Sequence, residues 1–156
     1  MGMRALVIDY GRVREVEVDS LADMQGLVGG NVELFGPGAE LFDGVDLFVN
    51  EEGLSACFPN RCIVANEAMA EAGYVRQFES PWPSKRRSAF IGADEVCTVL
   101  YGPILAVGWD DEDGSSVSLT EDQIEAVKTY FDGGDRRTWP GSGAAWVDLL
   151  RRRSRL

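Results

Sequence analysis

The sequence predicts an α+β fold, a single domain with a mixed or mainly antiparallel sheet and two to four short helices. Short apolar runs bounded by Gly, Pro and Asn recur along the chain, which is typical of strands joined by tight turns. Between them, apolar residues three and four positions apart indicate amphipathic helices. We expect a core domain over residues 1–135 with an irregular loop at 74–93, followed by a C-terminal tail over 136–156 that carries a short helix.

The N-terminal half supplies most of the expected strands. Tyr10-Gly11 separates two strands that we expect to pair as a hairpin at a sheet edge, the second of them half exposed. Ser20 is followed three residues later by Asp23, which approximates a capping box and predicts a short helix that ends at Gly29. The strands expected here are residues 3–9, 12–18, 31–35 and 46–50.

The C-terminal half is expected to supply the buried centre. Near-continuous apolar runs at 96–100 and 104–108 suit strands of a sheet that is covered on both faces. An apolar stripe predicts a helix over residues 62–72. Thr120 and Gln123 form a capping box that opens a further helix. The apolar face of that last helix consists of Ile124, Val127, Tyr130 and Phe131, and Gly133-Gly134 ends it.

The composition excludes several activities. Histidine is absent, which leaves no Ser-His-Asp or Cys-His arrangement and no imidazole general base. The formal net charge is −11, from 26 acidic and 15 basic residues, so most of the surface would repel the phosphate backbone of a nucleic acid. We therefore expect a non-enzymatic protein that needs no cofactor and does not bind nucleic acid directly.

Neither the cysteines nor the acidic loop fits a metal site. Cys57, Cys62 and Cys97 are too few for a structural zinc site, and their odd number and wide spacing favour reduced, buried thiols. Asp111 and Asp113 resemble part of a calcium-binding loop, but the register leaves no acidic residue at its first and last positions. A solvated loop is expected there instead.

Polar residues at the ends of two expected elements are candidate binding residues. Asn50 and Glu51 end one strand, and Asn60 and Arg61 precede a later helix. Side chains at such ends can point into a cleft, and Arg61 can offer its guanidinium to a carboxylate or a phosphate. The alternative is an internal salt bridge from Arg61 to Glu51 or Glu52 that ties two loops together.

Two tryptophans and a basic run are further candidates. Trp82 lies in a proline-flanked loop and Trp139 precedes Pro140, so each can either anchor a protein interface or pack over the edge of the core. The basic run that follows Trp82 is either a solvated loop or an anion-binding loop. It consists of Lys85, Arg86 and Arg87.

Short motifs, taken in their order along the chain, resemble a known family. They are Met3 to Asp9, Val13 to Val16, Leu27 to Glu33, Val49 to Gly53, Pro59 to Arg61, Tyr101 to Gly108 and Ser118 to Thr120. Their order is similar to that of the family named domain of unknown function 3846, over residues 3–131. That family occurs in bacteriophages and conjugative elements, so the resemblance implies an accessory protein in the cytosol of a bacterial host.

Three functions are compatible with these observations. The first is binding of a host protein or self-association, which in the context implied by the resemblance would counter or modulate host defence. The second is sequestration of a small anionic, nucleotide-like ligand by Arg61 and the basic run. The third is mimicry of DNA by the acidic surface. We favour the first, because the chain has no catalytic set and its acidic surface suits selective contacts with proteins. The apolar start of the chain is too short to span a membrane, so no membrane partner is expected.

Overall fold

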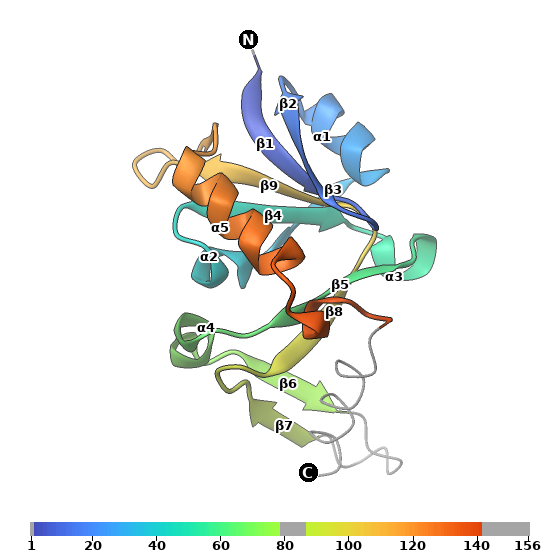
Figure 1. Ribbon diagram of the computed structural model, residues 1–156, viewed down its shortest axis with the longest axis vertical. Coiled ribbons are helices and arrows are strands. Elements are labelled where there is room, and N and C mark those ends of the chain that lie inside the picture. Colours follow the sequence, from blue (N-terminus) through green and yellow to red (C-terminus); the bar gives the residue numbers. More distant parts are fainter. Residues whose placement is uncertain (1, 79–86, 142–156) are drawn as a thin grey trace.

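The centre of the fold is an antiparallel sheet built on two apolar strands, β1 (Met3–Ile8) and β9 (Ile104–Trp109). The computed structural model describes residues 2–78 and 87–141, and Figure 1 shows their arrangement. The strand order is β2-β1-β9-β4-β3, and the short strand β10 also pairs with β9. The remaining strands of this sheet are β2 (Val13–Val18), β3 (Val32–Phe35), β4 (Val45–Asn50) and β10 (Ser116–Val117).

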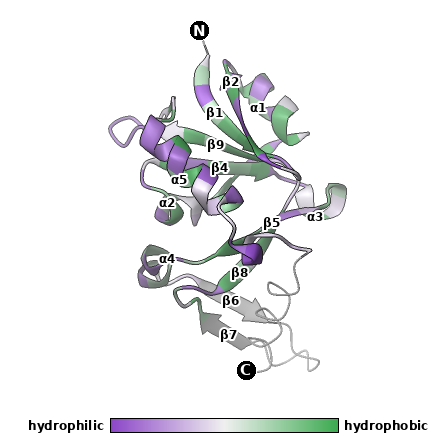
Figure 2. Ribbon diagram, in the orientation of Figure 1, coloured by the Kyte–Doolittle hydropathy of each residue, from purple (hydrophilic) through white to green (hydrophobic). Residues whose placement is uncertain are grey.

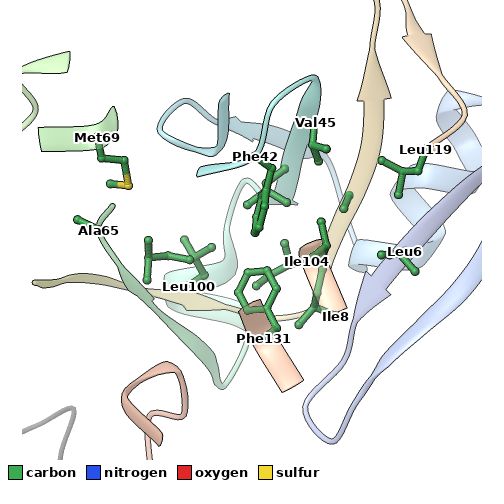
Figure 3. Packing of buried hydrophobic residues seen from close by; sticks show 14 of the residues in the cluster. Leu6, Ile8, Phe42, Val45, Ala65, Met69, Leu100, Ile104, Leu119 and Phe131 are labelled. Carbon is green, nitrogen blue, oxygen red and sulfur yellow. The ribbon is translucent and has the colours of Figure 1, made fainter. Parts of the chain in front are cut away.

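Alternation along the two central strands covers both faces of the sheet. Leu6 and Ile8 belong to the cluster that includes α5 (Glu121–Asp132), whereas Ala5 and Val7 belong to the cluster that includes α1 (Leu21–Val28). β9 divides in the same way, because successive side chains of a strand point to opposite faces. Figure 3 shows the larger cluster, in which the rings of Phe42 and Phe131 lie together. The buried parts of the two central strands are therefore apolar, whereas the exposed Arg4 gives β1 a hydrophilic position near its start (Figure 2).

Local hydrogen bonds define where the two covering helices begin and end. Oγ of Ser20 accepts a hydrogen bond from the backbone N–H of Asp23. Thr120 and Gln123 form a complete capping box, in which each side chain accepts a bond from the other residue's backbone N–H. Gly29 ends α1 in the left-handed conformation, with φ of 84°.

A second layer lies beside the sheet and consists of two antiparallel ribbons (Figure 1). The hydroxyl of Tyr130 joins it to α5, since it donates to the carbonyl of Val64 at 2.6 Å and accepts from the N–H of Val64 at 2.8 Å. Burial raises the pKa of this phenol. The elements of the layer are β5 (Pro59–Val64) with β8 (Val96–Tyr101), β6 (Val75–Phe78) with β7 (Arg87–Phe90), and α4 (Glu67–Ala72). Three short turns complete the described chain: α2 (Gly38–Leu41), α3 (Gly53–Ala56) and the 3-10 helix η1 (Arg136–Thr138).

The expected fold class is confirmed. All strand pairs among the described residues are antiparallel, and the five described α-helices are short. Two of these helices, α2 and α3, are single turns of four residues. The hairpin of β1 and β2 lies at the sheet edge, as expected. Among the described residues, no helix combines the length and the apolar character needed to cross a membrane.

The helix predicted over residues 62–72 is wrong in its first part. Cys62, Ile63 and Val64 continue β5, and the helix begins only after Asn66, whose side chain accepts a hydrogen bond from the N–H of Met69. All three residues are buried, so their apolar side chains satisfied the helical pattern as well as they satisfy a strand. Pairing with β8 decides between the two, and that contact is remote in sequence.

The irregular loop predicted at 74–93 is also corrected. Residues 75–78 and 87–90 pair as the β6–β7 hairpin, with Val75 opposite Phe90. Their mixed polar sequence lacks the alternation that indicates a strand. The apolar run at 96–100 forms the expected strand, but β8 pairs with β5 and not with β9. The short helix expected in the tail lies in residues 142–156, outside the described part.

Replacing Phe131 with alanine tests the role of α5. Phe131 has no exposed surface and its ring packs edge-on against that of Tyr130, with 4.8 Å between ring centroids. Phe131→Ala should lower the free energy of unfolding by about 3–5 kcal/mol, measured by urea denaturation. Thr129→Ala, at an exposed position of the same helix, should change it by less than about 0.5 kcal/mol. Equal effects of the two substitutions would contradict this packing.

Candidate functional site

Asn60 joins three separate parts of the backbone in the interior. Its side chain is 2% exposed, and its Nδ2 donates to the carbonyl of Ile8 at 2.7 Å and to the carbonyl of Gly102 at 2.8 Å. Its Oδ1 accepts a hydrogen bond from Nη1 of Arg61 at 2.8 Å. One amide therefore connects the end of β1, the turn between β8 and β9, and the start of β5.

Arg61 extends this connection to the end of α5. Nη1 also donates to the carbonyl of Tyr10 at 3.3 Å, and Nη2 lies 3.4 Å from Oδ1 of Asp132. The ring of Trp139 covers the guanidinium, 3.5 Å from its centre, as in a cation–π contact. Asp132 in turn accepts the N–H of Val13 at 2.8 Å, which fixes the start of β2. We call Asn60, Arg61, Asp132 and Trp139 the Asn60–Arg61 node.

The node is enclosed, and this decides between the two interpretations of Arg61. Arg61 has no exposed surface, so a ligand cannot reach its guanidinium from solvent. Burial lowers the pKa of Arg61, and the negative charges of Asp132 and Asp9 oppose that shift. Arg61 forms an internal salt bridge, but its partner is Asp132 and not Glu51 or Glu52, which are both exposed.

Asn50 anchors the α3 turn from its other end. The side chain is 7% exposed, its Nδ2 donates to the carbonyl of Val28 at 3.2 Å, and its Oδ1 accepts the N–H of Glu52 at 2.9 Å. Nδ2 also lies 3.8 Å from Sγ of Cys57. Asn50 therefore joins the end of β4 to the end of α1 and to both ends of α3.

Two glycines let the α3 segment lie flat against the turn that follows β8. A Cβ on Gly53 would lie 2.8 Å from the carbonyl oxygen of Tyr101, which leaves no space for a side chain. Gly102 has φ of 81°, and a Cβ there would meet Sγ of Cys57 at 2.8 Å. The N–H of Gly102 donates to the carbonyl of Phe58 at 2.9 Å. The segment 51–59 is thus fixed at its start, middle and end.

This fixed segment presents apolar side chains to solvent. Leu54 and Phe58 are each 78% exposed, more than any other large hydrophobic residue in the described chain. Tyr10, whose carbonyl is bonded to Arg61, is 43% exposed at the same end of the ribbon. Glu51 and Glu52 are exposed beside them. We call these five residues the Leu54–Phe58 surface, and Figure 1 shows α3, which carries part of it, projecting from the sheet.

Sequence reasoning found the anchors of this surface but not its exposed residues. Asn50, Asn60 and Arg61 were candidates either for a cleft or, through Arg61, for an internal salt bridge, and the structure places all three inside. Leu54 and Phe58 carried no signal, because an apolar residue in a short turn looks the same in sequence whether it faces the core or solvent.

The remaining candidate residues differ in where the structure places them. Trp139 packs on Arg61, so it is not a free anchor at an interface. Glu51 is exposed, as a binding residue requires. Trp82, Lys85 and Arg86 lie outside the described residues, and Arg87 is described only as the first residue of β7.

The acidic loop between β9 and β10 is held by its own side chains. Oδ1 of Asp110 accepts the N–H of Glu112, and Oδ1 of Asp113 accepts the N–H of Ser115. Hydrogen bonds from Ser115 lower the pKa of Asp113. In the described residues no group of three or more acidic or cysteine side chains is placed to hold a metal ion.

All three cysteines are free thiols. Cys62 is buried, and burial raises the pKa of its thiol to about 11. Sγ of Cys97 donates to the carbonyl of Ile63 at 3.3 Å. Cys57 is half-buried beside Gly102. Among the contacts described above, neither Cys57 nor Cys62 has a basic partner of the kind that activates a nucleophilic thiolate.

The fold and the site define an α+β protein whose buried polar side chains hold an exposed apolar turn. Residues 3–78 match the model of the family described as "Domain of unknown function (DUF3846)", and the resemblance to that family is confirmed over those residues. The match runs from β1 to the end of β6 and includes Asn50, the Leu54–Phe58 surface, Asn60 and Arg61. No curated protein and no solved structure matches the chain.

Asn60→Ala tests the structural role of the node. It removes three hydrogen bonds of the buried side chain, two to the carbonyls of Ile8 and Gly102 and one from the guanidinium of Arg61. The free energy of unfolding should fall by about 3 kcal/mol, measured by urea denaturation. Asn31→Ala, at an exposed position, should change it by less than about 0.5 kcal/mol. A stable Asn60→Ala variant would show that the node does not hold these elements together.

Thiol reactivity tests the burial of Cys62. At about pH 8, a disulfide reagent should modify Cys57 in the folded protein, whereas Cys62 should react only after unfolding. The folded pKa of Cys62 is raised above its ordinary value of 9.0, so its contribution to stability is complete below about pH 9 and is lost as the pH rises through about 11. Cys57→Ser should remove the fast reaction. Fast modification of Cys62 in protein that is still folded would contradict its burial.

Proposed function

We propose that this chain is a non-enzymatic protein-binding module and that the Leu54–Phe58 surface contacts its partner. The observation that carries the proposal is the exposure of two large apolar side chains, four residues apart, on one rigid turn. Leaving such side chains in water costs free energy that a partner would recover by covering them. Aromatic and large aliphatic residues at the centre of an interface commonly supply most of its binding energy.

Rigidity supports the proposal as much as exposure does. The backbone of the segment is held at Glu52 by the side chain of Asn50 and at Phe58 by the N–H of Gly102, whose own carbonyl is bonded to Asn60. A surface that is already ordered loses little conformational entropy on binding. The buried polar residues that were expected to bind a ligand thus serve to present their apolar neighbours.

The charge beside the surface indicates what kind of partner fits. Glu51 and Glu52 are exposed next to Leu54, so a partner segment that carries apolar side chains close to Lys or Arg is favoured. An anionic lipid surface would be repelled by these carboxylates and by the net charge of −11. The partner is therefore a protein.

The resemblance gives this binding a context. An accessory protein of a phage or mobile element would act in the bacterial cytosol on a host protein, and countering or modulating host defence is the role that such a setting favours. Self-association through the same surface is the alternative. The enclosure of Arg61 removes one of the two groups invoked for binding a nucleotide-like ligand. DNA mimicry stays a prediction without a specific observation in its favour.

Serine substitutions at the two exposed positions test the proposal. Tagged wild-type protein should recover a defined partner from a bacterial lysate, and the purified pair should bind at least about tenfold more weakly with Leu54→Ser or Phe58→Ser, by calorimetry. Both positions are exposed, so thermal stability should change little. Leu21→Ser, at a residue that is 59% exposed on α1, is the matched control and should bind like the wild type.

Light scattering of the same variants distinguishes binding of a partner protein from self-association through this surface. A wild-type dimer that becomes monomeric in Phe58→Ser, but not in Leu21→Ser, would assign the surface to a second copy of the chain. A partner that binds all the variants with equal affinity would refute the proposed surface.

A further inference from the structure

A second surface lies between α2 and α5, away from the Leu54–Phe58 surface. It is a groove of about 510 Å³ whose apolar lining, which we call its floor, includes Leu41, Phe42, Ala126 and Tyr130. Thr129 and the acidic residues Asp122 and Glu125 also line it, and we call the two acids its rim. Figure 1 shows α2 and α5 next to each other on the side of the sheet remote from α3. The proposed contact at α3 does not use this groove, so the inference below goes beyond that function.

The two exposed flanks of α5 differ in charge balance. On the flank toward β1 and β2, Glu121 lies 2.6 Å from Nη1 of Arg4, and Lys128 lies 3.3 Å from Oε1 of Glu15. On the groove flank, Asp122 and Glu125 have no ion-pair partner among the described residues, and both are exposed. The groove flank therefore carries negative charge that the described chain does not balance.

An apolar floor with an acidic rim suits a ligand that has apolar side chains next to positively charged ones. Asp122 and Glu125 are three residues apart on a helix, so their carboxylates project from adjacent turns along one side of the groove. Because Asp122, Glu125 and Ala126 are exposed, the groove is a trough and not an enclosed pocket of the kind that surrounds a small molecule. Amphipathic helices bind such troughs by laying their apolar face on the floor.

We propose that this groove binds a cationic amphipathic helix of a partner protein. The apolar side chains of that helix would cover Leu41, Ala126 and Tyr130, and its Lys or Arg residues would pair with Asp122 and Glu125. Charge complementarity selects this occupant over an acidic or neutral helix. With the Leu54–Phe58 surface at another side, one chain can contact two proteins at once.

The test uses the full chain and a synthetic peptide. The probe is a fluorescent amphipathic helix with leucine on its apolar face and lysine on its polar face, and its comparison peptide carries glutamate in place of lysine. Fluorescence anisotropy should detect binding of the lysine peptide alone. Asp122→Asn with Glu125→Gln should weaken that binding by about tenfold, and Ala126→Lys, which adds bulk and positive charge to the floor, should weaken it further.

A matched pair of acids on another helix controls for general attraction to an acidic protein. Glu67 and Glu71 are exposed on α4, and Glu67→Gln with Glu71→Gln changes the net charge by the same amount. This variant should bind the lysine peptide like the wild type. Equal weakening by both double variants, or no binding of the lysine peptide by the wild type, would overturn the proposal.

Two further results would assign the groove to a different occupant and so overturn it. The first is much tighter peptide binding when Arg151, Arg152 and Arg153, which lie outside the described residues, are changed to glutamate, because the basic run of the chain itself would then compete for the groove. The second is a wild-type dimer that Ala126→Lys dissociates. Circular dichroism of each variant confirms that the fold is retained.

Discussion

The side chains of Asn60 and Arg61 hold together parts of the chain that no regular hydrogen-bond ladder connects. The main sheet and the β5–β8 ribbon are separate sheets, and no strand is shared between them. Asn60 crosses this gap by donating to the carbonyl of Ile8, at the end of β1. Arg61 then reaches Asp132 at the end of α5 and lies under Trp139. One buried amide and one buried guanidinium thus add specific polar links to the shared apolar cluster and the Tyr130 contact that also join the two layers.

Burying a guanidinium costs free energy unless its donors find acceptors. Here Nη1 and Nη2 are satisfied, whereas Nε is buried with no hydrogen-bond partner in the described structure. The stacked ring of Trp139 and the carboxylate of Asp132 offset part of that cost. Such an arrangement selects one geometry, because few other packings would supply these acceptors and this ring together. Its contribution is therefore specific positioning rather than net stability.

The fixed backbone around α3 keeps the side chains of Leu54 and Phe58 exposed. A turn that carries two exposed hydrophobic side chains would collapse onto the nearest apolar surface if its backbone were free to move. The bonds of Asn50 to Glu52 and of Gly102 to Phe58 prevent this, and the close approach of Gly53 to Tyr101 leaves the turn no deeper position. The polar interior and the apolar exterior of this region are therefore two parts of one arrangement.

The amino-acid sequence by itself determined the elements whose signals are local. Ser20 and the capping box of Thr120 with Gln123 located both covering helices, and alternation or apolar runs located β1, β3, β4 and β9. These signals succeed because caps and periodicities act within a few residues.

Only the tertiary structure decided the features that depend on remote contacts. Residues 62–64 became a strand because β8 was available to pair with them. Arg61 pairs with Asp132, 71 positions away in the chain, and not with Glu51 or Glu52, which are close in sequence. Leu54 and Phe58 are exposed on a segment whose backbone is fixed by Asn50 and by Gly102, the latter 44 positions from Phe58 in the chain. In each case the sequence offered several partners of the right chemistry, and three-dimensional proximity selected one.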